Sequence, residues 1–364
     1  MKYASTCLWL TAITLFCSTL ANQLLSQETT AERIPVVIAH RGASGYLPEH
    51  TEGAKVLAVA QGADYVEQDV VLTRDGVFVV SHDITMDDTT DVAEKFPDRK
   101  RTDGKFYFAD FDWNELRQLS VHERANPRTH KPVFAERFSG TAGQRILRLE
   151  DEILLLQGLN HTLDRNVGLY IELKGAHWHH AHFGQHMGAK LLPLLATFGY
   201  DSDRDRCFIQ CFEPAELKYL ADELRCKLPL IQLVGNRPLG LLPDGTSETG
   251  SQPAVIDTLK QELSEVAKFA SGIGPAIDLV VVPDAQGQPQ STGLCEAAHE
   301  LGLLVHPYTV RRDGLPSWAA DVDELQRVLL QSVRVDGFFT DFPDLGRAAV
   351  DSLHTNLSRF APRN

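Results

Sequence analysis

The sequence alternates short apolar runs, rich in β-branched and aromatic residues, with longer segments whose apolar residues recur at helical spacing. Runs of the first kind are typical of strands, and segments of the second kind are typical of amphipathic helices. The strand-like runs lie at 36–42, 65–73, 77–83, 167–174, 207–212, 228–234, 279–283, 303–310 and 335–343. The helical segments lie at 51–63, 148–160, 188–200, 214–225, 258–270, 291–302 and 322–333. Because strands that alternate with helices pair in parallel, this order predicts an α/β fold.

A (β/α)₈ arrangement, the TIM barrel, accounts best for this alternation. If the run at 77–83 is a hairpin-like extension of the strand before it, the remaining runs and their helices fit that fold. A doubly wound sheet is the alternative. The stretch at about 84–145 matches neither pattern, so we expect an inserted subdomain after the second strand. In a barrel, a segment that follows a strand lies on the C-terminal face, where active sites form.

The first residues of the chain have the features of a secretory signal peptide at 1–21. Lys2 precedes an apolar run at 8–20 that is too short to span a bilayer, and small residues follow it. We therefore expect an exported protein, periplasmic or secreted, whose mature chain at 22–364 is a single domain. No other segment approaches transmembrane length, so stable membrane insertion is not expected.

The formal net charge of −14 at pH 7 argues against a nucleic-acid partner, because binding to a phosphate backbone needs a basic surface. Positive charge that binds an anionic substrate must therefore be local. Cys207 and Cys211 lie in one predicted strand, too far apart to form a disulfide with each other. The sequence does not decide the state of the other cysteines, nor whether the chain is a monomer or a homodimer.

Acidic residues in two predicted strands indicate a metal site. Glu67 and Asp69 are two positions apart and so point to the same side of a strand, which is costly for like charges in a buried sheet. The same parity places Glu172 and Lys174 on one side of another strand. Three carboxylates without suitable cysteine ligands favour Ca²⁺ or Mg²⁺ over zinc.

Two histidines stand where apolar runs give way to polar loops. His40 follows the apolar part of the run at 36–42, and His82 follows that of the run at 77–83. On opposite sides of a metal-held group, two imidazoles can act as general base and general acid. Arg41 offers a planar fork for phosphate oxygens, and Lys174 can add a point charge. A metal, two cations and two histidines suit a phosphodiester better than an ester or a glycoside.

These motifs together resemble one known family. The segments "AHRGASGYLPEHT", "EQDVVLTRDGVFVVSHD", "IELK", "HPYTVRRDGLP" and "DGFFTDFP" are similar to the glycerophosphodiester phosphodiesterase family, in particular to its periplasmic bacterial branch. The resemblance runs from about Pro35 to the last helix. A single element of this kind would be weak, but their joint occurrence is very specific.

The resemblance implies a catalytic TIM barrel that binds one divalent cation. The implied reaction is hydrolysis of small deacylated phospholipids, such as glycerophosphocholine, to sn-glycerol 3-phosphate and an alcohol. The implied metal ligands are Glu67, Asp69 and Glu172. The implied acid/base pair is His40 and His82, with Arg41 as a phosphate ligand. Glu49 is expected to orient His40 or Arg41.

Several alternatives stay open at this point. The nucleophile is water or a neighbouring hydroxyl of the glycerol, and either histidine can be the acid. An exported location favours Ca²⁺ over Mg²⁺. His306, Tyr308, Phe339 and Asp341 also approach strand ends, where substrate contact and barrel packing are equally expected. The rival functions are a phospholipase that acts on intact lipids with a similar barrel, and an exported binding protein that has kept the fold.

Overall fold

The computed structural model describes residues 34–126, 128–140, 143–184, 186–242 and 252–360. The signal peptide predicted at 1–21 lies outside these ranges. From Pro35 onward the described chain forms one compact unit. Within the described residues, no helix combines the length and the apolar character that a membrane crossing needs.

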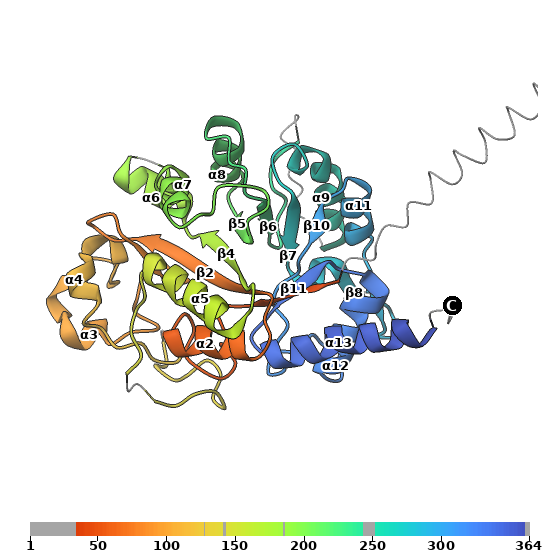
Figure 1. Cartoon of the computed structure of the whole chain (residues 1–364), viewed down its shortest axis with the longest axis horizontal. Helices are drawn as coiled ribbons and strands as arrows, with labels where there is room; N and C mark the ends of the chain where they lie inside the picture. Colours follow the sequence, from red (N-terminus) through yellow and green to blue (C-terminus); the bar gives the residue numbers. More distant parts are fainter. Residues whose placement is uncertain (1–33, 127, 141–142, 185, 243–251, 361–364) are drawn as a thin grey trace, which may run out of the picture. The chain divides into compact units, whose positions relative to one another are not determined.

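The centre of this unit is a parallel barrel, shown in Figure 1. Its strands are β1 (Val36–Ala39), β2 (Tyr65–Leu72), β4 (Gly168–Leu173), β5 (Cys207–Cys211), β6 (Leu230–Val234), β7 (Gly272–Pro275), β10 (Leu304–Val305) and β11 (Gly337–Thr340). They pair in the order β10-β7-β6-β5-β4-β2-β1-β11. Beyond β10, the amide of Val310 donates to the Phe339 carbonyl at 2.8 Å, which brings the two ends of the sheet together. The predicted TIM barrel is confirmed.

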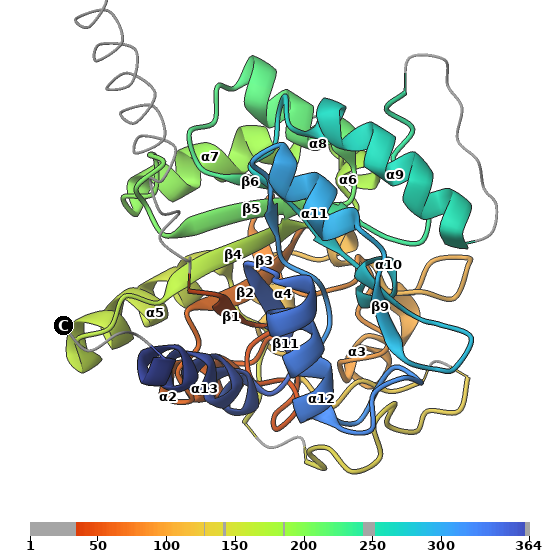
Figure 2. The ribbon, with the colours of Figure 1, turned by 90° about the vertical axis from the view of Figure 1, so that its right-hand side faces the viewer.

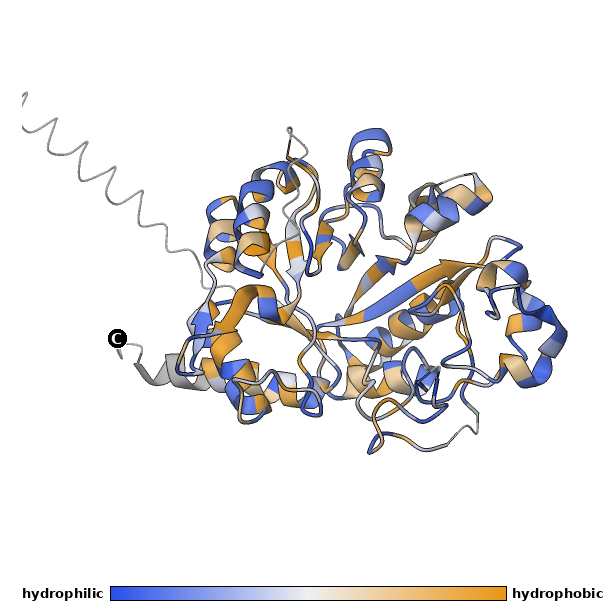
Figure 3. Ribbon diagram, turned by 180° about the vertical axis from the view of Figure 1, so that it is seen from behind, coloured by the Kyte–Doolittle hydropathy of each residue, from blue (hydrophilic) through white to orange (hydrophobic). Residues whose placement is uncertain are grey.

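Helices surround the strands, as Figure 2 shows. The barrel helices are α2 (Glu52–Ala60), α5 (Leu149–Leu163), α6 (Ala176–Phe183), α7 (Met187–Thr197), α8 (Pro214–Lys218) with η3 (Tyr219–Glu223), α9 (Gln252–Val266), α11 (Leu294–Glu300), α12 (Val322–Arg327) with η4 (Val328–Val333), and α13 (Pro343–Phe360). Capping residues start two of them: Thr51 accepts the Ala54 amide, and Asp321 accepts the Glu324 amide. Figure 3 shows hydrophobic residues along the strands and mixed faces on the helices.

The strand predicted at 279–283 is wrong as a barrel strand. This segment forms the short helix α10 (Ile277–Val280) and then β8 (Val281–Pro283), which pairs with β9 (Pro289–Ser291) in a small antiparallel ribbon. The barrel strand is β7, a few residues earlier. A Cβ on Gly272 would lie 2.7 Å from the Leu304 carbonyl, so this strand needs glycine where its neighbours approach closely. Gly272 and Gly274 stand where a strand would usually carry β-branched residues, so the sequence of β7 does not show the pattern of a strand.

The segment at 84–145 packs beside an extension of β2. β3 (Phe78–Val80) pairs antiparallel with the end of β2, and the segment then forms α3 (Val92–Lys95), η1 (Pro97–Arg99), η2 (Phe108–Asp110) and α4 (Trp113–Leu116). An apolar cluster joins the segment to these strands, and consists of Val71, Val79, Met86, Val92, Phe106, Phe108, Phe111, Leu116, Leu119, Val121 and Ile146. This second core holds the segment on the barrel.

Candidate active site

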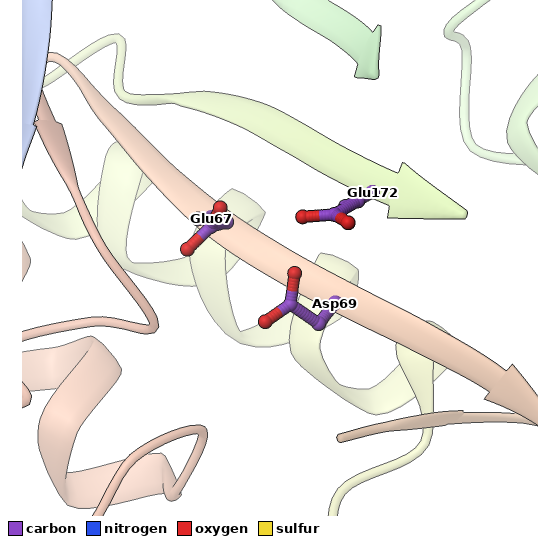
Figure 4. Close-up of side chains that lie close together, drawn as sticks. All are labelled: Glu67, Asp69 and Glu172. Carbon is purple, nitrogen blue, oxygen red and sulfur yellow. The ribbon is translucent and has the colours of Figure 1, made fainter. Parts of the chain in front are cut away.

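Three carboxylates converge from two neighbouring strands, β2 and β4. Glu67 and Asp69 project from β2 and Glu172 from β4, and Figure 4 shows their side chains pointing toward one another. All three are buried, and one ligand atom from each lies within 4.8 Å of the other two. The side chains that parity placed on common strand faces therefore meet in one cluster.

The charge of this cluster is incompletely balanced by protein groups. Burial, together with the charges of Asp69 and Glu172, raises the pKa of Glu67 well above its usual value. Burial also raises the pKa of Glu172 to about 8, although Lys174 opposes the shift. The Oδ1 atom of Asp69 is buried without a hydrogen-bond partner. Crowded carboxylates with a free oxygen fit a hard divalent cation, which all three residues could hold.

Arg41 and Lys174 flank the three carboxylates. The Arg41 amide donates to Glu67 Oε2 at 2.9 Å, and its guanidinium Nε lies 3.6 Å from Asp69 Oδ2. Lys174 Nζ lies 2.7 Å from Glu172 Oε1. The backbone has positive φ at both Arg41 (+57°) and Gly42 (+87°), and a Cβ on Gly42 would lie 2.8 Å from the Ala54 backbone, so this tight turn requires glycine at position 42.

His40 follows β1 and is held by a residue from the opposite end of the chain. Its Nδ1 lies 2.6 Å from Oδ1 of Asp341, which directly follows β11. Burial and the charge of Arg41 lower the pKa of His40 to about 4, against the opposing effect of Asp341. With Nδ1 engaged, Nε2 is the ring nitrogen left for chemistry, and it lies 3.9 Å from Glu67 Oε2.

His82 is held in the same way by its own neighbour. Its Nδ1 lies 2.8 Å from Oδ1 of Asp83, again leaving Nε2 for chemistry. Burial and the charges of Arg41 and Lys174 lower the pKa of His82 to about 4. Its side chain is 31% exposed, compared with 9% for His40, so water reaches this histidine more easily.

Glu49 links two arginines above the cluster. Its Oε2 accepts from Arg41 Nη1 at 3.0 Å, and Arg124 donates to both of its oxygens, at 2.9 and 2.6 Å. Burial alone would raise the pKa of Glu49, but the charges of Arg41 and Arg124 lower it well below its usual value. Glu49 was expected to orient either His40 or Arg41, and its contact is with Arg41.

Both histidines, Arg41, Lys174 and two of the three carboxylates line one cavity of about 260 Å³. Its lining consists of His40, Arg41, Glu67, His82, Glu172, Lys174, Gln210, Phe212, Leu233, Tyr308, Thr309, Arg311 and Phe339. Ionisable groups therefore share the cavity with an apolar wall. Of the residues left open between substrate contact and packing, Tyr308 and Phe339 line the cavity, whereas His306 is buried and bonds the Tyr170 hydroxyl at 2.9 Å.

Sequence reasoning missed several groups that hold the site together. Gln210, at the end of β5, donates to Glu67 Oε1 at 2.9 Å, and His50 Nε2 lies 2.8 Å from Asp69 Oδ2. The position of Asp83 beside His82 was a signal in the sequence that could have indicated its contact. No comparable signal marks Arg124 or Arg137, which contact the site from the segment at 84–145.

Comparison with known proteins gives a consistent result. The model of the glycerophosphoryl diester phosphodiesterase family matches residues 40–345. A glycerophosphodiester phosphodiesterase of Haemophilus influenzae is 36% identical over 349 residues, which cover 91% of this chain and 93% of the relative. One of Treponema pallidum is 36% identical over 322 residues, covering 85% and 90%. An Oleispira antarctica phosphodiesterase, solved with the product sn-glycerol-3-phosphate, shares the fold with a TM-score of 0.57 at 20% identity, covering 87% of this chain and 97% of that one.

Proposed function

We propose a function from the premise that the chain belongs to the glycerophosphoryl diester phosphodiesterase family and is an enzyme that hydrolyses glycerophosphodiesters. From this premise we propose that its substrates are small deacylated phospholipids such as glycerophosphocholine and glycerophosphoethanolamine. The products are sn-glycerol 3-phosphate, which the Oleispira antarctica relative binds, and the free alcohol. We propose further that the reaction depends on a divalent cation and on acid/base catalysis by His40 and His82.

One observation carries this proposal. His40 and His82 line the same cavity as Glu67 and Glu172, and each histidine has its Nδ1 occupied by an aspartate. A phosphodiester beside the carboxylate cluster would therefore lie within the reach of both Nε2 atoms. Arg41 and Lys174 line the same cavity and supply positive charge for its non-bridging oxygens.

Each protein group has a definite part in the proposed reaction. A bound divalent cation would neutralise charge that develops on the phosphate oxygens. One histidine accepts the proton of the nucleophile at Nε2, and the other donates a proton from Nε2 to the oxygen of the departing alcohol. The lowered pKa of both rings keeps them neutral at neutral pH, which suits the base. The acid gains its proton when the anionic substrate binds beside it. Water and a neighbouring glycerol hydroxyl both satisfy this scheme as the nucleophile.

For the cation we propose Ca²⁺ over Mg²⁺, held by Glu67, Asp69 and Glu172. Ca²⁺ accepts irregular cages of carboxylate oxygens, whereas Mg²⁺ demands near-octahedral geometry. The choice also depends on location, because we propose that the protein is exported to the periplasm or beyond. The support for export is the leader-like sequence at 1–21. Mass determination of the protein recovered from the producing cells would show whether that leader is removed.

The test is release of glycerol 3-phosphate from glycerophosphocholine by the purified mature chain. We expect chelator to abolish release and Ca²⁺ to restore it more fully than Mg²⁺. Glu172→Gln should lose the response to the cation, whereas Glu296→Gln, on the exposed surface of α11, should keep it. No release by folded protein with either ion would contradict the proposed substrate, and release from intact lipids instead would indicate a phospholipase.

A further inference from the structure

Two arginines of the segment at 84–145 reach the aspartates behind the two histidines. Arg124 contacts Asp83, which holds His82. Arg137 contacts Asp341, which holds His40. Thus each histidine contacts an aspartate, and that aspartate in turn contacts an arginine. Both arginines come from the segment at 84–145, outside the barrel.

Arg124 joins the His82 side of the cavity to Glu49. Its Nη1 donates to Asp83 Oδ2 at 2.7 Å, while Nε and Nη2 hold the two oxygens of Glu49. The backbone around Arg124 is itself fixed, because its carbonyl accepts the Val133 amide at 2.8 Å. The arginine therefore bridges two carboxylates with one rigid fork, which a lysine could not do.

Arg137 joins the His40 side to a second acidic residue. Its Nη2 donates to Asp341 Oδ2 at 2.7 Å, and its Nε and Nη2 bond the two oxygens of Asp313 at 2.7 and 2.8 Å. The guanidinium also lies 3.7 Å from the Phe134 ring centre, and the Arg137 side chain is only 5% exposed. A buried, paired and stacked guanidinium of this kind has one orientation.

The two contacts are not explained by anchoring alone. Other arginines of the segment form carboxylate pairs that stay within it, such as Arg101 with Asp110 at 2.7 and 2.8 Å. Arg124 and Arg137 instead each donate to one carboxylate oxygen of an aspartate, and the other oxygen of that aspartate contacts a histidine. Asp341 Oδ2 also accepts from Arg311 Nε at 2.8 Å, so both oxygens of Asp341 are held by hydrogen bonds. Fixing the aspartate fixes the tautomer and the plane of the ring that it binds.

We propose that Arg124 and Arg137 are positioning residues for the reaction: Arg124 orients His82 through Asp83, and Arg137 orients His40 through Asp341. The segment at 84–145 is then a part of the catalytic machinery, although neither arginine lines the cavity. This inference rests on the proposed acid/base function of the two histidines.

The experiment compares Arg124→Gln, Arg137→Gln and the matched control Arg101→Gln in the full mature chain. Two quantities are measured for each: kcat and KM for glycerophosphocholine, and the ¹⁵N chemical shifts of the imidazole nitrogens, which report the tautomer of each ring. Signals are assigned with His40→Ala and His82→Ala. Arg124→Lys and Arg137→Lys keep the charge but not the fork, and replace the glutamine variants if those do not fold.

We expect Arg124→Gln and Arg137→Gln to lower kcat by about 10–100-fold with little change in KM, as is typical when a partner behind a functional side chain is removed. Arg137→Gln should change the ¹⁵N shifts of His40 and leave those of His82, and Arg124→Gln should do the reverse. Arg101→Gln should change neither ring and keep kcat. Loss of kcat without the paired change in ring shifts would overturn the inference, as would unchanged kcat in both glutamine variants.

The failure of this inference differs from the failure of the proposed function. If His40→Ala or His82→Ala keeps normal turnover, that histidine has no catalytic role, whatever its arginine does to the ring. If both alanine variants lose turnover while both arginine variants keep it, the proposed function stands and the positioning role is wrong.

Discussion

His40 and His82 each direct Nδ1 toward an aspartate, but the two arrangements belong to different parts of the molecule. His40 and Asp341 follow neighbouring barrel strands, β1 and β11, and are 301 positions apart in sequence. His82 and Asp83 are adjacent in sequence and lie in a loop after β3. The His40 pair is nearly inaccessible to water, whereas His82 and Asp83 are 31% and 35% exposed.

The difference indicates that the barrel strands hold one aspartate in place, whereas the segment at 84–145 holds the other. Hydrogen-bonded parallel strands bring His40 and Asp341 together directly, in register from Val36 opposite Gly337 to Ala39 opposite Thr340. No such ladder holds Asp83. Arg124 donates instead to Oδ2 of Asp83, the oxygen that does not contact His82. We therefore expect His40 to be important for both stability and turnover, and His82 for turnover chiefly.

The largest effect should come from removing either ring. His40→Ala and His82→Ala should each lower turnover of glycerophosphocholine by about 10²–10⁴, the usual contribution of a general acid or base. His82→Ala should keep the melting temperature of the wild type, whereas His40→Ala should lower it. His161→Ala, on the exposed end of α5, is the control and should change neither quantity. Near-normal turnover in one variant would remove that histidine from the mechanism.

The two aspartates should differ in stability. Asp341→Asn leaves Arg137 and Arg311 facing a neutral, buried amide, and we expect a loss of about 3 kcal/mol in the free energy of unfolding. Asp83→Asn weakens a partly exposed pair with Arg124 and should cost no more than about 1 kcal/mol. Urea unfolding of both variants measures the difference. Equal losses would show that the barrel and the loop hold their histidines equally firmly.

A third comparison concerns His306, a buried histidine that bonds a tyrosine hydroxyl and so separates burial from the effect of an aspartate contact. Burial lowers its pKa from 6.5 to about 4, so the unfolded chain takes up its proton first as the pH falls. The stabilisation is therefore complete above about pH 6.5 and is lost down to about pH 4, at about 1.4 kcal/mol per pH unit. Unfolding free energies measured across this range should fall less steeply in His306→Asn. Parallel curves would mean that folding does not lower the pKa of His306.

Most of the barrel could be predicted from the sequence because most of its strands are apolar runs, as burial in a parallel sheet requires. β2 and β4 are buried on both faces and read as apolar runs, and the alternation within them placed Glu67 and Asp69 on one side. β7 could not be predicted in this way. Its glycines meet a packing requirement set by Leu304 and Leu233, which are distant in sequence.

The site could be predicted only in part, for a similar reason. His40 and His82 follow strands, and the three carboxylates lie on paired strands of the barrel, β2 and β4, so the fold itself brings these groups together. Arg124 and Arg137 lie in a segment without helical or strand periodicity, and its path depends on contacts with Asp83, Asp313 and Asp341. Charged residues in such a segment are indistinguishable by sequence from those of a solvated loop.

The central claim is that two histidines, held by different parts of the molecule, face one phosphate beside the three carboxylates. A crystal structure of the mature chain with Ca²⁺ and glycerol 3-phosphate tests it most directly. We predict that the cation contacts Glu67, Asp69 and Glu172, and that Nε2 of His40 and Nε2 of His82 approach the phosphate from opposite sides. A phosphate bound away from the carboxylates, or with either imidazole turned away from it, would contradict the account.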